Sequence, residues 1–196
     1  MLKRILLVLT ASAFMISSAI ASPTDEVKKT VDEVVRIVAD KELKKNEAKR
    51  RQALKKSISK IFDYTEMAKR SLGKHWNARS AAEKKQFAEL FATLLENSYA
   101  GKIESYNNEK IIYLKETVES DHAEIKSKVI TSSRDEYTID YRIFKQNDKW
   151  MVYDVVIEGV SLVSNYRSQF NKIITANGYD KLVKKLQSKN EELKAP

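Results

Sequence analysis

The chain has 196 residues, with 36 Lys and Arg against 27 Asp and Glu, and it has no cysteine. The lack of cysteine excludes a fold held by disulfides, so stability has to come from a hydrophobic core, which a single domain of this length can build. The positive charge suits nucleic acid, anionic lipid or an acidic partner.

The first 21 residues have the three parts of an export signal. Lys3 and Arg4 form a positive start, an apolar run follows, and Ala19-Ile20-Ala21 has the small-x-small form of a cleavage site. A membrane anchor is the alternative, although the run is rich in Ser and Ala. We expect cleavage to release residues 22–196, with 34 basic and 27 acidic residues and a net charge of +7. Export argues against nucleic acid as a partner.

Helical periodicity covers most of residues 22–108. The helix predicted near residues 46–61 is strongly basic. Its charge suits contact with anionic head groups or with an acidic partner, and it equally suits a face that is simply solvated. The expected helices are one capped by Thr24, one near residues 46–61, a short one from Asp63 to Leu72-Gly73, and a long one opened by the capping box Ser80-Ala81-Ala82-Glu83.

After residue 108 the apolar period changes from 3.6 to 2, which predicts strands. Short polar turns separate them, so an antiparallel meander is expected, followed by two helices near 163–176 and 179–193. The sequence therefore predicts an α+β domain at 22–196, with a four-stranded curved antiparallel sheet (109–163) packed against a helical lobe (22–108 and 164–196). The strands are predicted at 110–118, 122–131, 137–144 and from Trp150 toward Val163.

Several motifs of the chain resemble those of the periplasmic MlaC proteins, also called the toluene-tolerance family. The motifs are Phe62-Asp63-Tyr64, Trp150-x-Val152-Tyr153-Asp154-Val155, Glu158-Gly159-Val160-Ser161-Leu162, Tyr166-Arg167-Ser168-Gln169-Phe170 and Gly178-Tyr179-Asp180-Lys181-Leu182. The run from Trp150 to Phe170 is the most specific part, and the resemblance extends over nearly all of residues 22–196.

The resemblance implies a periplasmic phospholipid carrier of a Gram-negative envelope. Such a carrier shuttles lipid between an outer-membrane lipoprotein complex and an inner-membrane complex of an MCE protein and an ABC transporter. The implied fold is similar to nuclear-transport-factor-like cones with added N- and C-terminal helices, and acyl chains insert between sheet and helices. A related branch of the family associates with hopanoids. We expect a monomer that is no enzyme, has no cofactor or metal, and carries phospholipid as cargo.

The chemistry of a carrier requires an enclosed apolar cavity. Two acyl chains hold roughly 30 methylene-sized groups, each worth about 0.8 kcal/mol on leaving water, so a shallow groove cannot compete with a bilayer. Sheet residues pointing at the helices are the expected lining, although the same pattern suits an ordinary core. The predicted lipid-binding residues are Ile125, Val129, Tyr137, Ile139, Tyr141, Ile143, Tyr153, Val155, Ile157, Val160 and Leu162.

Asp154 interrupts the apolar fourth strand, and a buried carboxylate needs a cation or several donors. We predict a structural pair with Arg167 that fixes the corner at Glu158-Gly159. The enzyme alternative is a secreted lipid hydrolase with Ser161, a histidine and Asp154 as its triad. His75 and His122 are the only histidines and belong to no metal or nucleophile motif.

Overall fold

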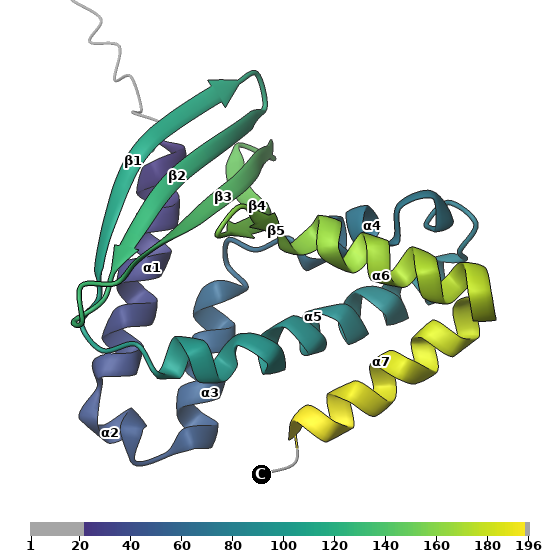
Figure 1. Ribbon diagram of the computed structural model, residues 1–196, viewed down its shortest axis with the longest axis horizontal. Helices are drawn as coiled ribbons and strands as arrows, with labels where there is room; N and C mark the ends of the chain where they lie inside the picture. The colour runs from purple at the N-terminus through teal and green to yellow at the C-terminus, as the bar shows by residue number, and fades with distance from the viewer. Residues whose placement is uncertain (1–21, 195–196) are drawn as a thin grey trace, which may run out of the picture.

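The computed structural model describes residues 22–194 and has an α+β architecture in which a curved sheet lies beside a block of helices (Figure 1). The helices are α1 (Pro23–Ala39), α2 (Lys41–Lys44), α3 (Glu47–Ile58), α4 (Tyr64–Leu72), the 3-10 turn η1 (Gly73–His75), α5 (Ala81–Glu104), α6 (Leu162–Asn177) and α7 (Tyr179–Lys194). The strands are β1 (Lys110–Glu119), β2 (His122–Ile130), β3 (Glu136–Gln146), β4 (Lys149–Ile157) and β5 (Val160–Ser161). The predicted fold class, with added N- and C-terminal helices, is confirmed.

The predicted export signal lies outside the described residues. Within residues 22–194, no helix combines the length and the hydrophobicity needed to cross a bilayer.

The sheet is an antiparallel meander in the order β1-β2-β3-β4-β5, so the predicted count of four strands is one short. The fifth strand arises because Glu158 and Gly159 both have positive φ, 49° and 76°. Two such residues in succession form a tight hairpin turn. The stretch expected to continue as one strand therefore folds back, and Val160 pairs with Ile157.

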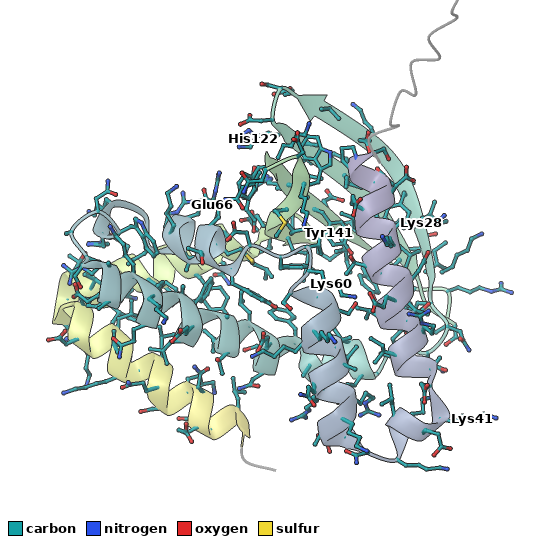
Figure 2. The ribbon with its side chains drawn as sticks, turned by 180° about the vertical axis from the view of Figure 1, so that it is seen from behind. Lys28, Lys41, Lys60, Glu66, His122 and Tyr141 are labelled. Carbon is teal, nitrogen blue, oxygen red and sulfur yellow. The ribbon has the colours of Figure 1, made fainter. Side chains whose placement is uncertain are left out.

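The alternation predicted for β2 is confirmed. Ala123, Ile125, Ser127 and Val129 are all buried, whereas the residues between them are not. The buried side is called the inner face here, and α1 lies over it (Figures 1 and 2). The outer face carries the alternate, mostly charged residues.

The N-terminus of α1 is fastened to the sheet. Ser22, not the predicted Thr24, caps this helix, and its side chain accepts from the backbone N–H of Asp25 at 3.1 Å. Pro23 can occupy the first helical position because its missing N–H would have no partner there. The N–H of Thr24 donates instead to the carboxylate of Glu116 on β1, at 2.7 Å.

A second core lies among α4, α5, α6 and α7, beside the sheet (Figure 1). Its centre is aromatic, with the rings of Phe87 and Phe91 in edge-to-face contact with that of Phe170, at centroid distances of 5.6 and 5.5 Å. Phe62 packs against this core and also against the inner-face residues. The helical block thus has its own hydrophobic support, and Phe62 connects it with the sheet.

The end of α4 depends on a glycine. Gly73 has φ 56° and ψ −129°, a conformation open almost only to glycine. The side chain of Arg167 in α6 packs next to Gly73. A Cβ added at Gly73 would lie 3.5 Å from the Cγ and Cδ atoms of Arg167. The Nε–H of Arg167 donates to the carbonyl of Arg70 at 2.7 Å and so joins α6 to the last turn of α4.

Replacing Gly73 by alanine is expected to lower the free energy of unfolding by about 1–3 kcal/mol, because the new side chain forces strain at positive φ. Gly101→Ala is the matched control. Gly101 lies within α5 with nothing within 4 Å of its added Cβ, so that change is expected to be stabilising by up to about 1 kcal/mol. Urea denaturation of both variants checks this, and shifts of the same sign would contradict it.

Candidate functional site

The side chains of the inner face and the helices over it form one apolar group, called here the inner-face cluster. Helix α1, the connection between α3 and α4, strands β1–β4 and the start of α6 all contribute to it. Its buried members are Val27, Ile61, Ala123, Ile125, Ile143, Trp150, Val152 and Val155, and its partly buried members are Val31, Phe62, Tyr113, Ile139, Tyr141, Ile157 and Leu162.

Most of the predicted lipid-binding residues lie on this inner face. Ile125 and Ile143 are fully buried, and Val129 and Val155 nearly so. A second group is only half-buried and forms a partly open apolar row: Tyr137, Ile139, Tyr141, Ile157 and Leu162. The register joins the two groups, because Tyr137 lies opposite Val129 and Tyr141 opposite Val155, while Ile139 and Ile157 lie opposite each other within the row.

Val160 extends the row but is not enclosed. It pairs with Ile157, yet 56% of its surface is exposed. The expectation that Val160 lines a closed cavity is therefore wrong. The two-residue strand β5 lies at the edge of the sheet, where no further strand or helix covers this side chain among the described residues.

Tyr153 lies on the outer face, which corrects its place in the predicted lining. The register shifts between Arg142 and Ile143, so that Arg142 lies opposite Asp154 but Ile143 lies opposite Val152. This β-bulge leaves Tyr153 as the extra residue and interrupts the period of two. The Tyr153 ring contacts His122 and Phe144, which pair with each other on that face, at centroid distances of 5.9 and 6.0 Å.

The same bulge gives Asp154 a partner other than the predicted Arg167. The Asp154 side chain is 3% exposed and accepts from Arg142 Nη1 at 3.2 Å, from Ser161 Oγ at 2.6 Å and from the N–H of Val163 at 3.0 Å. The prediction of an Asp154–Arg167 pair is wrong, since Arg167 donates to the carbonyl of Arg70 instead. The carboxylate still fixes the corner between β4 and α6, because Ser161 and Val163 flank the start of that helix.

These contacts also bear on the hydrolase alternative. The hydroxyl of Ser161 donates directly to Asp154, with no histidine between them. His75 Nε2 instead lies 2.9 Å from Asn171 Oδ1, and His122 Nδ1 lies 2.7 Å from Asp121 Oδ1. The described residues therefore do not assemble the Ser161 triad, and nowhere in residues 22–194 do three or more potential metal ligands gather.

Tyrosine hydroxyls supply the main polar groups beside the inner-face cluster. The hydroxyl of Tyr113 on β1 is buried and has no hydrogen-bond partner among the described residues. Burial, reinforced by nearby Tyr141 and Asp32, raises the pKa of Tyr113 well above its usual value. Burial likewise raises the pKa of Tyr141 to about 12, with smaller contributions from Tyr137 and Asp140. Figure 2 shows Tyr141 beside α1, in the view onto the helix-covered face. Both phenols are therefore neutral donors at physiological pH.

Two hollows of the described surface lie elsewhere. One follows the charged outer side of α1, from Asp25 to Arg36, and another the lysine-rich side of α7, from Lys181 to Glu192. Neither includes a predicted lining residue. The buried members of the cluster pack against Val27 and Ile61. The side chains of Ile125 and Ile143 are therefore covered by α1 and the Ile61–Phe62 segment in this structure.

Sequence reasoning missed the part of the cluster that comes from outside the sheet. Val27 and Val31 show the helical spacing that predicted α1, but nothing in that spacing says which surface the helix covers. Ile61 and Phe62 enter through a parallel bridge between Phe62 and Val152, a contact across some 90 positions in the chain. Phe62 and Trp150 belong to the sequence motifs named above, and this was the signal that could have assigned Ile61 and Phe62 to the inner-face cluster.

Known proteins resemble this chain in sequence and in fold. The family model for MlaC protein matches residues 28–188. The chain is 28% identical over 121 residues to the intermembrane phospholipid transport system binding protein MlaC of Haemophilus influenzae, a match that covers 59% of this chain and 56%, or about half, of that relative. It is 26% identical over 183 residues to the toluene tolerance protein ttg2D of Pseudomonas putida, covering 91% of this chain and 85% of the relative.

A solved structure has the same fold. It is that of a phospholipid-binding protein from Ralstonia solanacearum in complex with a phospholipid, and it superimposes with a TM-score of 0.82 at 26% sequence identity. The match covers 89% of this chain and 100% of that one. Because the family model extends over most of the described residues and the fold agrees over nearly the whole domain, this chain belongs to the MlaC family.

Proposed function

We propose that this protein is a periplasmic phospholipid carrier that holds acyl chains against the inner-face cluster. The observation that carries the proposal is the continuous apolar surface made by the sheet, α1 and the Ile61–Phe62 segment, part of which is only half-buried. The family relationship, the transport role in the name of the Haemophilus influenzae relative and the phospholipid bound by the Ralstonia solanacearum protein support it. The carrier exchanges lipid with an outer-membrane lipoprotein complex and an inner-membrane complex of an MCE protein and an ABC transporter.

The lining that we propose begins at the half-buried row of Tyr137, Ile139, Tyr141, Ile157 and Leu162. An acyl chain laid along this row displaces water from apolar surface, at about 25 cal/mol per Å². Further insertion toward Ile125, Val129, Ile143 and Val155 requires α1 to move, and α1 is suited to that. It has few contacts with the sheet beyond the Val27 and Val31 side chains and the bond from Thr24 to Glu116. The energy for lipid exchange comes from the partner complexes, because the chain contains no Walker or G-x-G-x-x-G sequence.

Native mass spectrometry of the protein purified from an envelope extract tests this function. A mass increment that fragments to phospholipid is the expected result, and a hopanoid increment would place the protein in the related branch of the family. A protein that carries neither and fails to take up lipid from mixed micelles would contradict the proposal. Incubation with phospholipid addresses the hydrolase alternative, since a carrier releases no fatty acid.

The unpartnered hydroxyl of Tyr113 leads to a specific prediction. We propose that it donates to a glycerol or ester oxygen of the bound lipid. Tyr113→Phe is then expected to stabilise the lipid-free protein by about 1 kcal/mol, because it removes an unsatisfied buried polar group. The same change is expected to weaken lipid affinity by about three- to tenfold through the lost hydrogen bond.

Thermal denaturation of delipidated protein and titration with a fluorescent phospholipid measure the two effects. Tyr106→Phe is the control, since that hydroxyl already donates to the carbonyl of Glu109 at 2.6 Å and its loss should destabilise. If Tyr113→Phe destabilised the lipid-free protein, or left lipid affinity unchanged, Tyr113 would not have the role proposed.

A further inference from the structure

The net charge of the described protein is concentrated in one short segment. Residues 41–60, called here the basic segment, contain nine Lys and Arg against two Glu, a net charge of +7. The rest of residues 22–196 contains 25 basic and 25 acidic residues and is neutral. The basic segment comprises α2, α3 and the residues that join them to their neighbours, at the end of α1 away from its N-terminus (Figure 1).

Some cations of the basic segment pair with glutamates of neighbouring helices. Arg50 pairs with Glu104 of α5 at 3.2 Å, and both side chains are largely buried. Lys55 pairs with Glu96 of α5, and Lys60 with Glu33 of α1, each at 3.0 Å. These pairs link the segment to α1 and α5, so the charges of these three cations are compensated.

Four lysines of the basic segment have no acidic partner among the described residues: Lys41, Lys44, Lys49 and Lys56. All four are exposed. Lys49 and Lys56 are seven residues apart on α3 and lie opposite the buried Leu54, so they point away from the core. Lys41 projects from the far end of the fold, whereas Lys60 lies at the end of α3 near the sheet (Figure 2).

We propose that the basic segment is a docking surface for an anionic lipid bilayer. Uncompensated lysines on flexible stems suit the diffuse charge of mobile head groups, with each lysine near the surface strengthening binding about fivefold. A protein interface would be expected to centre on aromatic residues or Arg, because lysine is depleted from interface cores. Here the described segment has no aromatic residue, and its two arginines, the largely buried Arg50 and the exposed Arg51, are both paired with glutamates.

Docking through this segment also defines an orientation. The segment follows α1 directly, and α1 covers the inner face on which we propose that the cargo lies. A bilayer in contact with α2 and α3 would therefore lie next to the end of α1, the helix that must move to admit an acyl chain.

Cosedimentation with vesicles tests the docking surface. The protein of residues 22–196 is mixed with vesicles of phosphatidylcholine alone, or of equal parts phosphatidylcholine and phosphatidylglycerol. We expect binding only to the anionic vesicles, and weaker binding as salt is added, since screening shortens the reach of the charges. Replacing Lys41, Lys44, Lys49 and Lys56 together by glutamine is expected to weaken binding at least about a hundredfold.

The matched control removes the same charge elsewhere. Lys172, Lys181, Lys184 and Lys185 of α6 and α7 are also exposed and unpaired among the described residues, and their change to glutamine is expected to leave vesicle binding within about threefold of the original protein. Equal loss in both variants would show that only net charge matters and would overturn the proposal. The proposal would also be overturned if the folded protein did not bind anionic vesicles. The four lysines would then be candidates for binding an acidic protein surface instead.

Cargo is measured separately by extracting bound lipid from each variant before mixing. If no bound lipid were found in any of the proteins, the original included, that would count against the proposed carrier function. It would not affect the docking result. Retained cargo with unchanged docking in the quadruple variant would count against the docking surface alone. Far-ultraviolet circular dichroism checks whether each variant is folded.

Discussion

A protein in which Ile139 and Ile157 are both replaced by lysine is expected to fold but to lose its bound phospholipid. These residues lie opposite each other on β3 and β4, are half-buried, and belong to the open row where we propose that an acyl chain first lies. Lysine can extend its ammonium to water in the lipid-free protein. An acyl chain over the row would bury that charge at a cost of about 2.5–3.5 kcal/mol per site, so affinity should fall by at least about a hundredfold.

The control carries the same substitution on the opposite side of the sheet. Ile112 is also half-buried, but it lies opposite Lys128 and therefore on the outer face. Ile112→Lys is expected to retain lipid. The amount of lipid retained is measured as the lipid phosphate extracted from equal amounts of each purified variant. Lipid retained by the double variant, or lost equally from Ile112→Lys, would place the binding surface away from the inner face.

Replacing Asp154 by alanine is expected to cause the largest loss of stability, about 3–5 kcal/mol. The substitution leaves the N–H of Val163 and the hydroxyl of Ser161 without their buried acceptor and removes one of the two acidic partners of Arg142, the other being Glu124. For a domain of this size the melting temperature should fall by about 10 °C. Differential scanning calorimetry of lipid-free protein measures it, and a fall of only a degree or two would show that the corner between β4 and α6 does not depend on the carboxylate.

Double-mutant cycles identify the partner of Asp154. The guanidinium of Arg142 lies 3.2 Å from the carboxylate but is 40% exposed, so solvent screening should limit the coupling to about 0.5–1 kcal/mol. No coupling is expected between Asp154 and Arg167, because Arg167 is bound to the carbonyl of Arg70. The reverse result would restore the pair that the sequence had indicated.

The strands were predictable where the periodicity is regular. In β2 every second residue from Ala123 to Val129 is buried, as the alternation indicates, and Ser80 and Glu83 form the predicted capping box at the start of α5. These features depend on neighbouring residues alone, so local spacing is enough to predict them.

The errors cluster where one residue changes a local period or where distant segments meet. The bulge opposite Ile143 turns Tyr153 outward, and the alternation of β4 alone does not reveal it, because the extra residue is defined only by the partner strand. The partner of Asp154 depends on the same register. Val27 and Phe62 cover the sheet through contacts between segments far apart in the chain. Local sequence patterns do not predict such contacts.

The presence of two hydrophobic centres has a consequence for how the family can diversify. The aromatic centre formed by Phe87, Phe91 and Phe170 contains no residue of the sheet. Substitutions at Ile139 or Ile157 therefore leave the packing of α4–α7 untouched, and the helical block can act as a scaffold while the inner face adapts to hydrocarbon of another length or shape. Selectivity for cargo and the capacity to fold are thus largely separable properties in this architecture.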